Sequence, residues 1–170
     1  MRDATPDDGA ACVGVYTPYV LASAATFEMQ PPSVEEMATR ITSAQDRHAW
    51  LVLQRNDVVV GYAYGGPFKT RPAYRWACEV SIYLAQDQRR AGGGRALYEA
   101  LLARLTERGY RTAAAGMTQP NDASAALHRA LGFEPVGTFR GVGWKLGRWH
   151  DVTWVQRALA AGDDPPTEPL

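Results

Sequence analysis

The sequence lacks the features that mark several large classes of protein. Its 170 residues carry a formal charge of zero and contain no apolar run near the length of about 18 residues that spans a bilayer. The two cysteines, Cys12 and Cys78, are too few and too far apart for a disulfide framework. The balanced charge argues against a generally basic nucleic-acid binder, and the start "MRDATPDDGA" has no apolar signal-peptide segment. We therefore expect a cytoplasmic protein that binds neither membrane nor nucleic acid.

Metal-binding patterns are missing as well. The three histidines, His48, His128 and His150, have no metal-ligand spacing with one another or with the cysteines. The sequence therefore predicts no metal.

What remains is the composition of one globular domain. Hydrophobic residues make up 46% of the chain and charged residues 21%. We expect a single domain over residues 1–160 and a disordered tail over 161–170, where "GDDPPTEPL" combines proline with acidic residues. No internal repeat is found.

Helical and extended patterns alternate along this domain. Capping residues and spacing predict helices over 5–23, 33–47 and 122–131, and a fourth helix opens in the glycines at 92–94. The expected strands are 49–54, 58–65, 76–85, 111–117, 135–146 and 151–159. A strand before the first helix would have little room in "MRDA". The fold class is therefore α/β with a mixed sheet.

The stretch "QRRAGGGRALYEALLARL" places three glycines where a long helix begins, although each glycine costs a helix about 1 kcal/mol against alanine. Bare backbone N–H groups at a helix start bind anions, and Arg89 and Arg90 add positive charge. A nucleotide P-loop is excluded because Arg95 and Ala96 follow Gly94, and the dinucleotide spacing is absent. An acyl-coenzyme A pyrophosphate site remains, with glycine used only for packing as the alternative.

At this point the sequence resembles the GCN5-related N-acetyltransferase (GNAT) family. Arg89-x-x-Gly92-x-Gly94 fits the family's cofactor signature, and "NDASAALHRALGF" fits its second motif. Residues 10 to 157 are similar to the phosphinothricin and methionine sulfoximine acetyltransferases. The resemblance implies a mostly antiparallel sheet flanked by helices and splayed at its central strands. It also implies direct transfer of acetyl from acetyl-CoA to the amine of a small amino-acid-like acceptor in a ternary complex.

The cofactor site implied by the resemblance includes the backbone of the strand "IYL", which would pair with the pantetheine arm and donate to the oxyanion. The resemblance also implies that Asn121 contacts the cofactor. Asn121 is an ordinary N-cap candidate as well, and the two roles are compatible. The predicted cofactor-binding residues are Ile82, Tyr83, Leu84, Arg89, Arg90, Ala91, Gly92, Gly93, Gly94, Arg95 and Asn121.

Glu79 and His128 are the catalytic candidates. Glu79 lies in an apolar strand, where burial raises the pKa of a carboxyl group toward that of a general base; the alternative is a solvent-facing or ion-paired glutamate. In the family, a carboxylate here acts through a water. His128 stands where many members have a tyrosine, and imidazole can move a proton in either direction. Packing alone is its alternative, and either residue could be the principal base. Cys78 points to the opposite face from Glu79 and is no nucleophile.

The acceptor side is predicted in "FKTRPAYRW", where Lys69, Arg71 and Tyr74 suit a zwitterion with a carboxylate. A solvated surface loop is the alternative. The resemblance adds Phe27. Glu28 departs from the pattern, because the phosphinothricin enzymes carry a cation there.

The aromatic hairpin "GWKLGRWHDV", around Trp144–His150, predicts either packing within the chain or an interface. The resemblance implies a homodimer through it.

Two other functions stay open: acetylation of a protein N-terminus or lysine, and a non-catalytic acyl-CoA binding module.

Overall fold

A computed structural model describes residues 1–88, 92–162 and 167–169. It contains one seven-stranded sheet in the order β1-β2-β3-β4-β5-β7-β6. The strands are β1 (Arg2–Asp3), β2 (Ala49–Arg55), β3 (Val58–Pro67), β4 (Ala77–Leu84), β5 (Thr112–Thr118), β6 (Glu134–Lys145) and β7 (Arg148–Ala158). Neighbouring strands are antiparallel except β4 and β5, which are parallel. The predicted mixed, mostly antiparallel sheet is confirmed.

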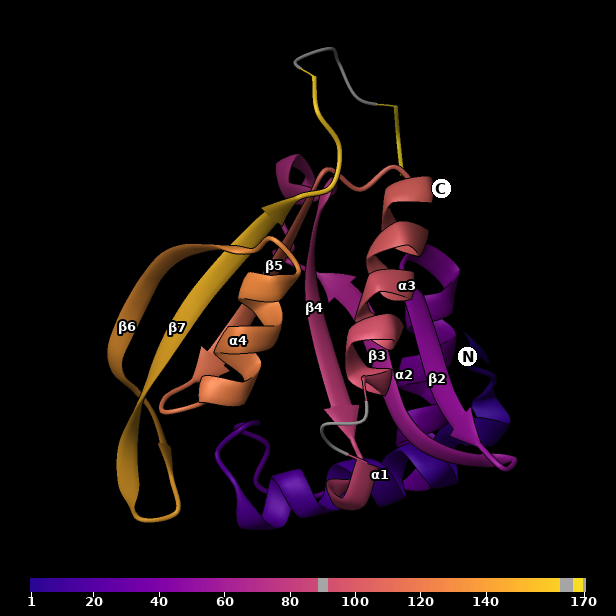
Figure 1. Cartoon of the computed structure of the whole chain (residues 1–170), viewed down its shortest axis with the longest axis vertical. Coiled ribbons are helices and arrows are strands. Elements are labelled where there is room, and N and C mark those ends of the chain that lie inside the picture. The colour runs from indigo at the N-terminus through magenta and orange to yellow at the C-terminus, as the bar shows by residue number, and fades with distance from the viewer. Residues whose placement is uncertain (89–91, 163–166, 170) are drawn as a thin grey trace.

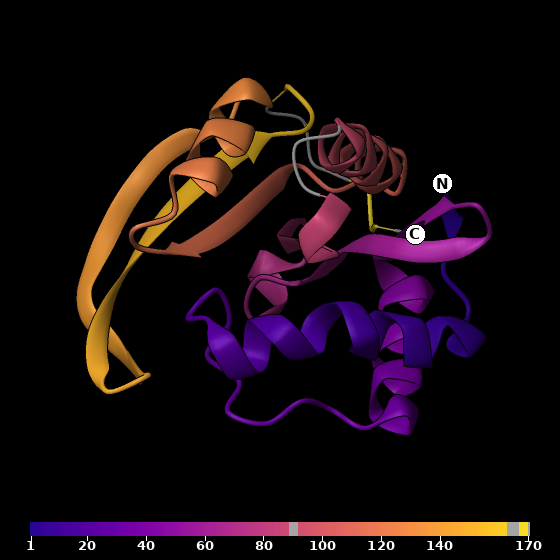
Figure 2. The same cartoon turned by 60° about the horizontal axis from the view of Figure 1, so that its bottom comes forward.

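Helices cover both faces of this sheet. They are α1 (Gly9–Ala22), α2 (Val34–Arg47), α3 (Gly93–Glu107) and α4 (Asp122–Ala130), with short 3-10 turns η1 (Pro6–Asp8), η2 (Pro72–Tyr74) and η3 (Gln86–Gln88). Figure 2 shows α1 and α2 on one side, and α3 and α4 on the other. In the described residues, no helix is long and apolar enough to cross a membrane.

Two buried clusters hold these layers together. One lies under α1 and α2 and includes Trp50, Val52 and Tyr62. The other lies under α3 and draws on the strands between the two edges of the sheet, from Leu51 in β2 to Val155 in β7. Burial of this apolar area from water is the main force that stabilises the layers.

The predicted element order needs one correction at its start. The structure begins with a strand, β1, which pairs with β2 through Arg2↔Val52 and Asp3↔Leu51. Two residues are enough because β1 only extends an edge. Ala4 then continues the contact, since its N–H donates to the carbonyl of Trp50.

The predicted tail is only partly described. The carbonyl of Thr167 accepts a hydrogen bond of 2.7 Å from Trp76 Nε1, and Glu168 pairs with Arg75 at 3.1 Å. Residues 163–166 and 170 lie outside the described residues, so disorder over 161–170 stays a prediction.

The central strands part after a short contact. β4 pairs with β5 only through Ala77↔Thr112, Cys78↔Ala113 and Glu79↔Ala114, and Figure 1 shows the two strands diverging below this point. The predicted splay is therefore present, and Glu79 is the last residue of β4 that pairs with β5.

Candidate active site

A cleft of about 730 Å³ opens where β4 and β5 separate. Its walls come from the end of β4, from β5 and from the starts of α3 and α4. Many predicted residues line this one space: Ile82, Tyr83, Leu84, Gly92, Gly94, Arg95, Asn121 and His128. Arg89, Arg90 and Ala91 lie outside the described residues, so their predicted role in phosphate binding remains a prediction.

Glycine is required for a different reason at each position at the start of α3. Gly92, the N-cap, has φ of 75°, in the left-handed region that favours glycine. A Cβ at Gly94 would lie 2.8 Å from Leu84 Cδ1, and one at Gly93 would lie 2.8 Å from Leu53 Cδ2. The packing alternative therefore accounts for Gly93, whereas Gly92 and Gly94 also line the cleft.

The edge of β4 offers backbone groups to this cleft. The N–H of Ala85 donates to the carbonyl of Val60 in β3. Successive residues of a strand turn their backbone groups to opposite sides, so Leu84 and Ile82 present theirs on the side of β5. A helix start lined by glycine and a strand edge whose backbone groups turn toward the cleft fit the diphosphate and the pantetheine arm of acetyl-CoA.

Asn121 has the structural role expected of an N-cap. Its side-chain oxygen accepts a hydrogen bond of 3.2 Å from the N–H of Ser124 in the first turn of α4. Since Asn121 also lines the cleft, capping and cofactor contact are compatible.

His128 is buried in the wall of the cleft with both ring nitrogens engaged. Nδ1 lies 2.8 Å from the carbonyl oxygen of Ser124, which only accepts, so we assign the proton to Nδ1. Nε2 lies 3.0 Å from the Tyr98 hydroxyl, which then donates to it. Burial lowers the pKa of His128, and the carbonyl of Ser124 only partly offsets this. The lowered pKa favours the neutral imidazole, which accepts the hydrogen bond from Tyr98 in the wall of the cleft.

Glu79 faces the other side of the sheet. Cys78 and Val80 are buried under α3, so alternation turns the half-buried Glu79 toward the α1 and α2 face. Burial raises the pKa of Glu79, and the positive charge of Lys69 lowers it by a smaller amount. A carboxyl group with a raised pKa beside a cation is the environment of a tuned general base.

A second cavity, of about 1180 Å³, lies on this face and contains the predicted acceptor residues Lys69, Arg71 and Tyr74. Tyr64 also lines it. Burial raises the pKa of Tyr64, and the charge of Glu79 adds to that rise. Two residues of this cavity, Tyr64 and Lys69, therefore interact electrostatically with Glu79, the candidate base.

Phe27 lies elsewhere. Its ring packs beneath the β6–β7 hairpin, 6.2 Å from the ring of His150, and only a glycine at position 143 leaves room for it. It lines neither this cavity nor the cleft.

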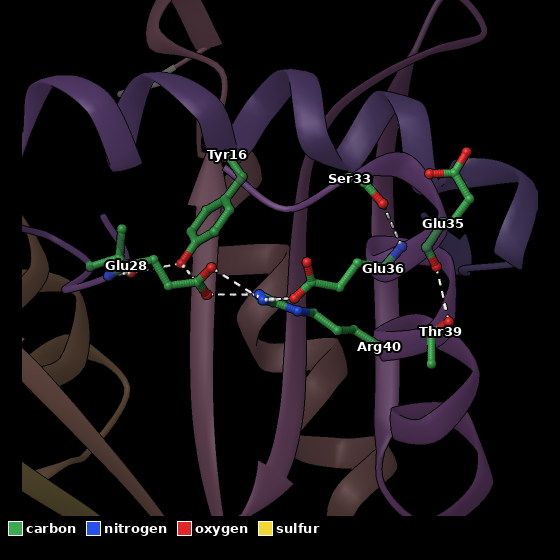
Figure 3. A network of polar contacts seen from close by, with 8 residues as sticks. Tyr16, Glu28, Ser33, Glu35, Glu36, Thr39 and Arg40 are labelled. Atoms are coloured by element: carbon green, nitrogen blue, oxygen red, sulfur yellow. Dashed lines mark hydrogen bonds and ion pairs between the residues drawn. The ribbon is translucent and has the colours of Figure 1, made fainter. Parts of the chain in front are cut away.

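Arg40 projects from α2 into the wall of the second cavity and is already paired (Figure 3). It donates to Glu28 at 2.7 and 3.1 Å and to Glu36 at 2.5 Å. The Tyr16 hydroxyl adds a hydrogen bond of 3.0 Å to Glu28. Burial raises the pKa of Glu28, but the bonds from Arg40 and Tyr16 outweigh this and lower it overall. The charge of Arg40 is therefore already balanced by two carboxylates, whereas Lys69 and Arg71 remain the predicted acceptor cations of this cavity.

Comparison with known proteins decides the identity of this arrangement. Residues 1–154 match the family described as "Acetyltransferase (GNAT) domain". The chain belongs to the GNAT acetyltransferase family. The predicted resemblance is confirmed, and this GNAT protein is an acetyl-CoA-dependent N-acetyltransferase.

Three relatives illustrate the match. The phosphinothricin N-acetyltransferase of Streptomyces viridochromogenes is 37% identical, over 100% of this chain and 93% of the relative. The L-methionine sulfoximine/L-methionine sulfone acetyltransferase of Pseudomonas paraeruginosa is 33% identical, over 94% of each chain. The crystal structure of a GNAT superfamily phosphinothricin acetyltransferase from Sinorhizobium meliloti in complex with AcCoA has a TM-score of 0.93 and 40% identity, over 98% of this chain and 92% of that one.

Sequence reasoning missed several residues of this GNAT site. Tyr98 could have been predicted, because it lies four positions after Gly94 and therefore on the same face of α3. Tyr19 and Arg40 could not, since their contacts join residues 65 and 12 positions apart. In the described residues, no group of three or more His, Cys, Asp or Glu side chains could hold a metal.

Proposed function

We propose that the enzyme acetylates the amine of a small amino-acid-like acceptor of the phosphinothricin or methionine sulfoximine type. One observation supports this most strongly: β4 leaves β5 directly after Glu79. The cofactor cleft therefore opens next to Glu79, whose carboxylate interacts electrostatically with Lys69 of the second cavity. An amine and a thioester brought from the two sides would meet there.

Two proton transfers are needed in this proposal, one at Glu79 and one at the pair formed by Tyr98 and His128. Acetyl-CoA supplies an acetyl group activated as a thioester. As the amine forms its bond to the carbonyl carbon and the carbon–sulfur bond breaks, Glu79 takes the amine proton, directly or through a water. The departing thiolate takes the hydroxyl proton of Tyr98, which otherwise donates to His128 Nε2, and the resulting phenolate regains a proton from water. A backbone N–H of β4 near Ile82 stabilises the carbonyl oxygen.

A thiol-release assay with acetyl-CoA and an acceptor panel tests the function. We expect turnover on methionine sulfoximine, methionine sulfone or phosphinothricin, because Lys69 and Arg71 suit an amino-acid carboxylate. The control acceptors are a peptide with a free N-terminus and a lysine peptide blocked at its N-terminus. Turnover only on the peptides would favour protein acetylation. Cofactor binding with no turnover on any acceptor would favour a binding module.

We also propose a homodimer formed through the β6–β7 hairpin. Large apolar side chains gather there with more than half of their surface exposed: Val136, Phe139, Val142, Trp144, Leu146 and Trp149. A patch of this kind on a monomer marks an interaction site. The same hairpin also contacts the loop after α1, because Lys145 Nζ donates to the carbonyl of Thr26 at 2.7 Å.

Replacing Trp149 with Glu is expected to give a monomer, because the change places a charge within the apolar patch. Light scattering after gel filtration measures the mass. Val58→Glu is the matched control, since Val58 is 61% exposed, close to the 63% of Trp149, but lies at the distant β2–β3 turn. Equal masses for the wild type and Trp149→Glu would refute this interface.

The cytoplasm is the proposed location. Cys12 and Cys78 are both free and buried, as is usual for proteins of a reducing compartment.

A further inference from the structure

The hydroxyl of Tyr19 reaches from the last turns of α1 to the end of β4. It donates to the carbonyl of Leu84 at 2.7 Å, and the N–H of Leu84 donates to it at 3.3 Å. A single side chain therefore makes both of the bonds that a neighbouring strand would give this residue.

These bonds lie on the cofactor side of β4. The next residue, Ala85, uses its N–H to pair with β3, so Leu84 turns its own backbone groups away from β3. Tyr19 and Leu84 both line the cleft. The hydroxyl consequently occupies a place on the strand edge where the pantetheine arm would pair.

The position of the hydroxyl is fixed by packing. The Tyr19 ring lies edge-on to the Tyr83 ring with centroids 5.1 Å apart, and Tyr83 also contacts Tyr16 at 4.8 Å. Ser23 Oγ donates to the carbonyl of Tyr19 at 2.9 Å. Edge-to-face aromatic pairs of this kind restrict ring movement. The contact with Leu84 is therefore a stable part of the cleft.

We propose that Tyr19 is a positioning residue for the cofactor arm: by occupying the Leu84 peptide, it confines the arm's strand-like pairing to Ile82 and beyond, toward Glu79. A shift of pairing by two residues along a strand moves the partner by about 6.6 Å. Such a shift would withdraw the thioester from Glu79. The inference rests on the cofactor placement proposed above.

The test is Tyr19→Phe, which keeps the ring packing and removes only the hydroxyl. Freed Leu84 groups offer the arm one or two further hydrogen bonds, so acetyl-CoA should bind about three- to tenfold more tightly. Part of the bound acetyl-CoA would then have its arm paired two residues away from the productive position. KM for acetyl-CoA and kcat should therefore both fall, by similar factors. Calorimetry and steady-state kinetics measure these effects.

Adenosine 3′,5′-bisphosphate, the nucleotide end without the arm, is the control ligand, and its affinity should not change. Tyr16→Phe is the control variant, because its hydroxyl belongs to the same aromatic cluster but bonds Thr26 and Glu28. It should leave the affinity for acetyl-CoA unchanged.

Each other outcome has a distinct meaning. Unchanged or weaker acetyl-CoA binding by Tyr19→Phe would overturn the positioning role. Weaker binding of both ligands would also overturn it, since the hydroxyl would then only support the fold. No binding of either ligand to the wild type would instead refute the cofactor placement itself.

Discussion

Replacing Glu79 with Gln is expected to lower kcat by roughly 100- to 10,000-fold near neutral pH, the usual contribution of a general base. The amide keeps the shape of the side chain but cannot take the amine proton. Affinity for acetyl-CoA should stay the same, because Glu79 does not line the cofactor cleft. Thiol-release kinetics and calorimetry measure the two effects separately.

The pH dependence gives a further check on the same variant. A base must be ionised, so kcat/KM should rise with pH through the pKa of Glu79, which burial has raised. Glu79→Gln should lose this rising limb. Lys69→Met should move it to higher pH, because the charge of Lys69 holds the pKa of Glu79 down. An unchanged profile in Glu79→Gln would remove this residue from the mechanism.

Replacing Gly92 with Val is expected to weaken acetyl-CoA binding by about 10- to 100-fold, the loss of one or two hydrogen bonds to a charged group. Gly92 has φ of 75°, and a β-branched residue avoids that region. The start of α3 must therefore rearrange, and its N–H groups lose their alignment on the diphosphate. Calorimetry with acetyl-CoA measures the loss.

Gly132→Val is the matched control for this change. Gly132 has φ of 77°, and, as at Gly92, a Cβ there would meet no atom within 4 Å. Both variants should lose about 1–2 kcal/mol of folding free energy from left-handed backbone strain. Only Gly92→Val should lose affinity. Equal affinities in both variants would show that the glycine turn does not bind phosphate.

The parts of the site that follow from local pattern could be predicted from the sequence. Ser33 with Glu36 three positions later predicts a helix start, and the N–H of Glu36 does donate to Ser33 Oγ at 3.1 Å. Alternation along β4 places Cys78 and Glu79 on opposite faces, as the buried cluster shows. The glycines at the start of α3 predict a phosphate site with packing as the alternative, and the close approach of Gly94 to Leu84 is of the packing kind.

Contacts between distant segments could not be predicted in this way. β1 is too short to show an alternating pattern, and its existence depends on the edge of β2. The bond between Tyr98 and His128 joins two helices 30 positions apart. Such pairs are decided by the packing of elements against one another, and a single sequence carries no periodic signal for them.

The short union of β4 and β5 gives α3 a mechanical role. With only three residue pairs between these strands, the two portions of the molecule are held together chiefly by side chains beneath α3, among them Leu97, Leu101 and Leu105. The packing of α3 against the sheet thus sets the distance between β4 and β5 beyond their paired residues. Substitutions that weaken this packing would misalign the thioester and the amine at a smaller loss of stability than unfolding requires.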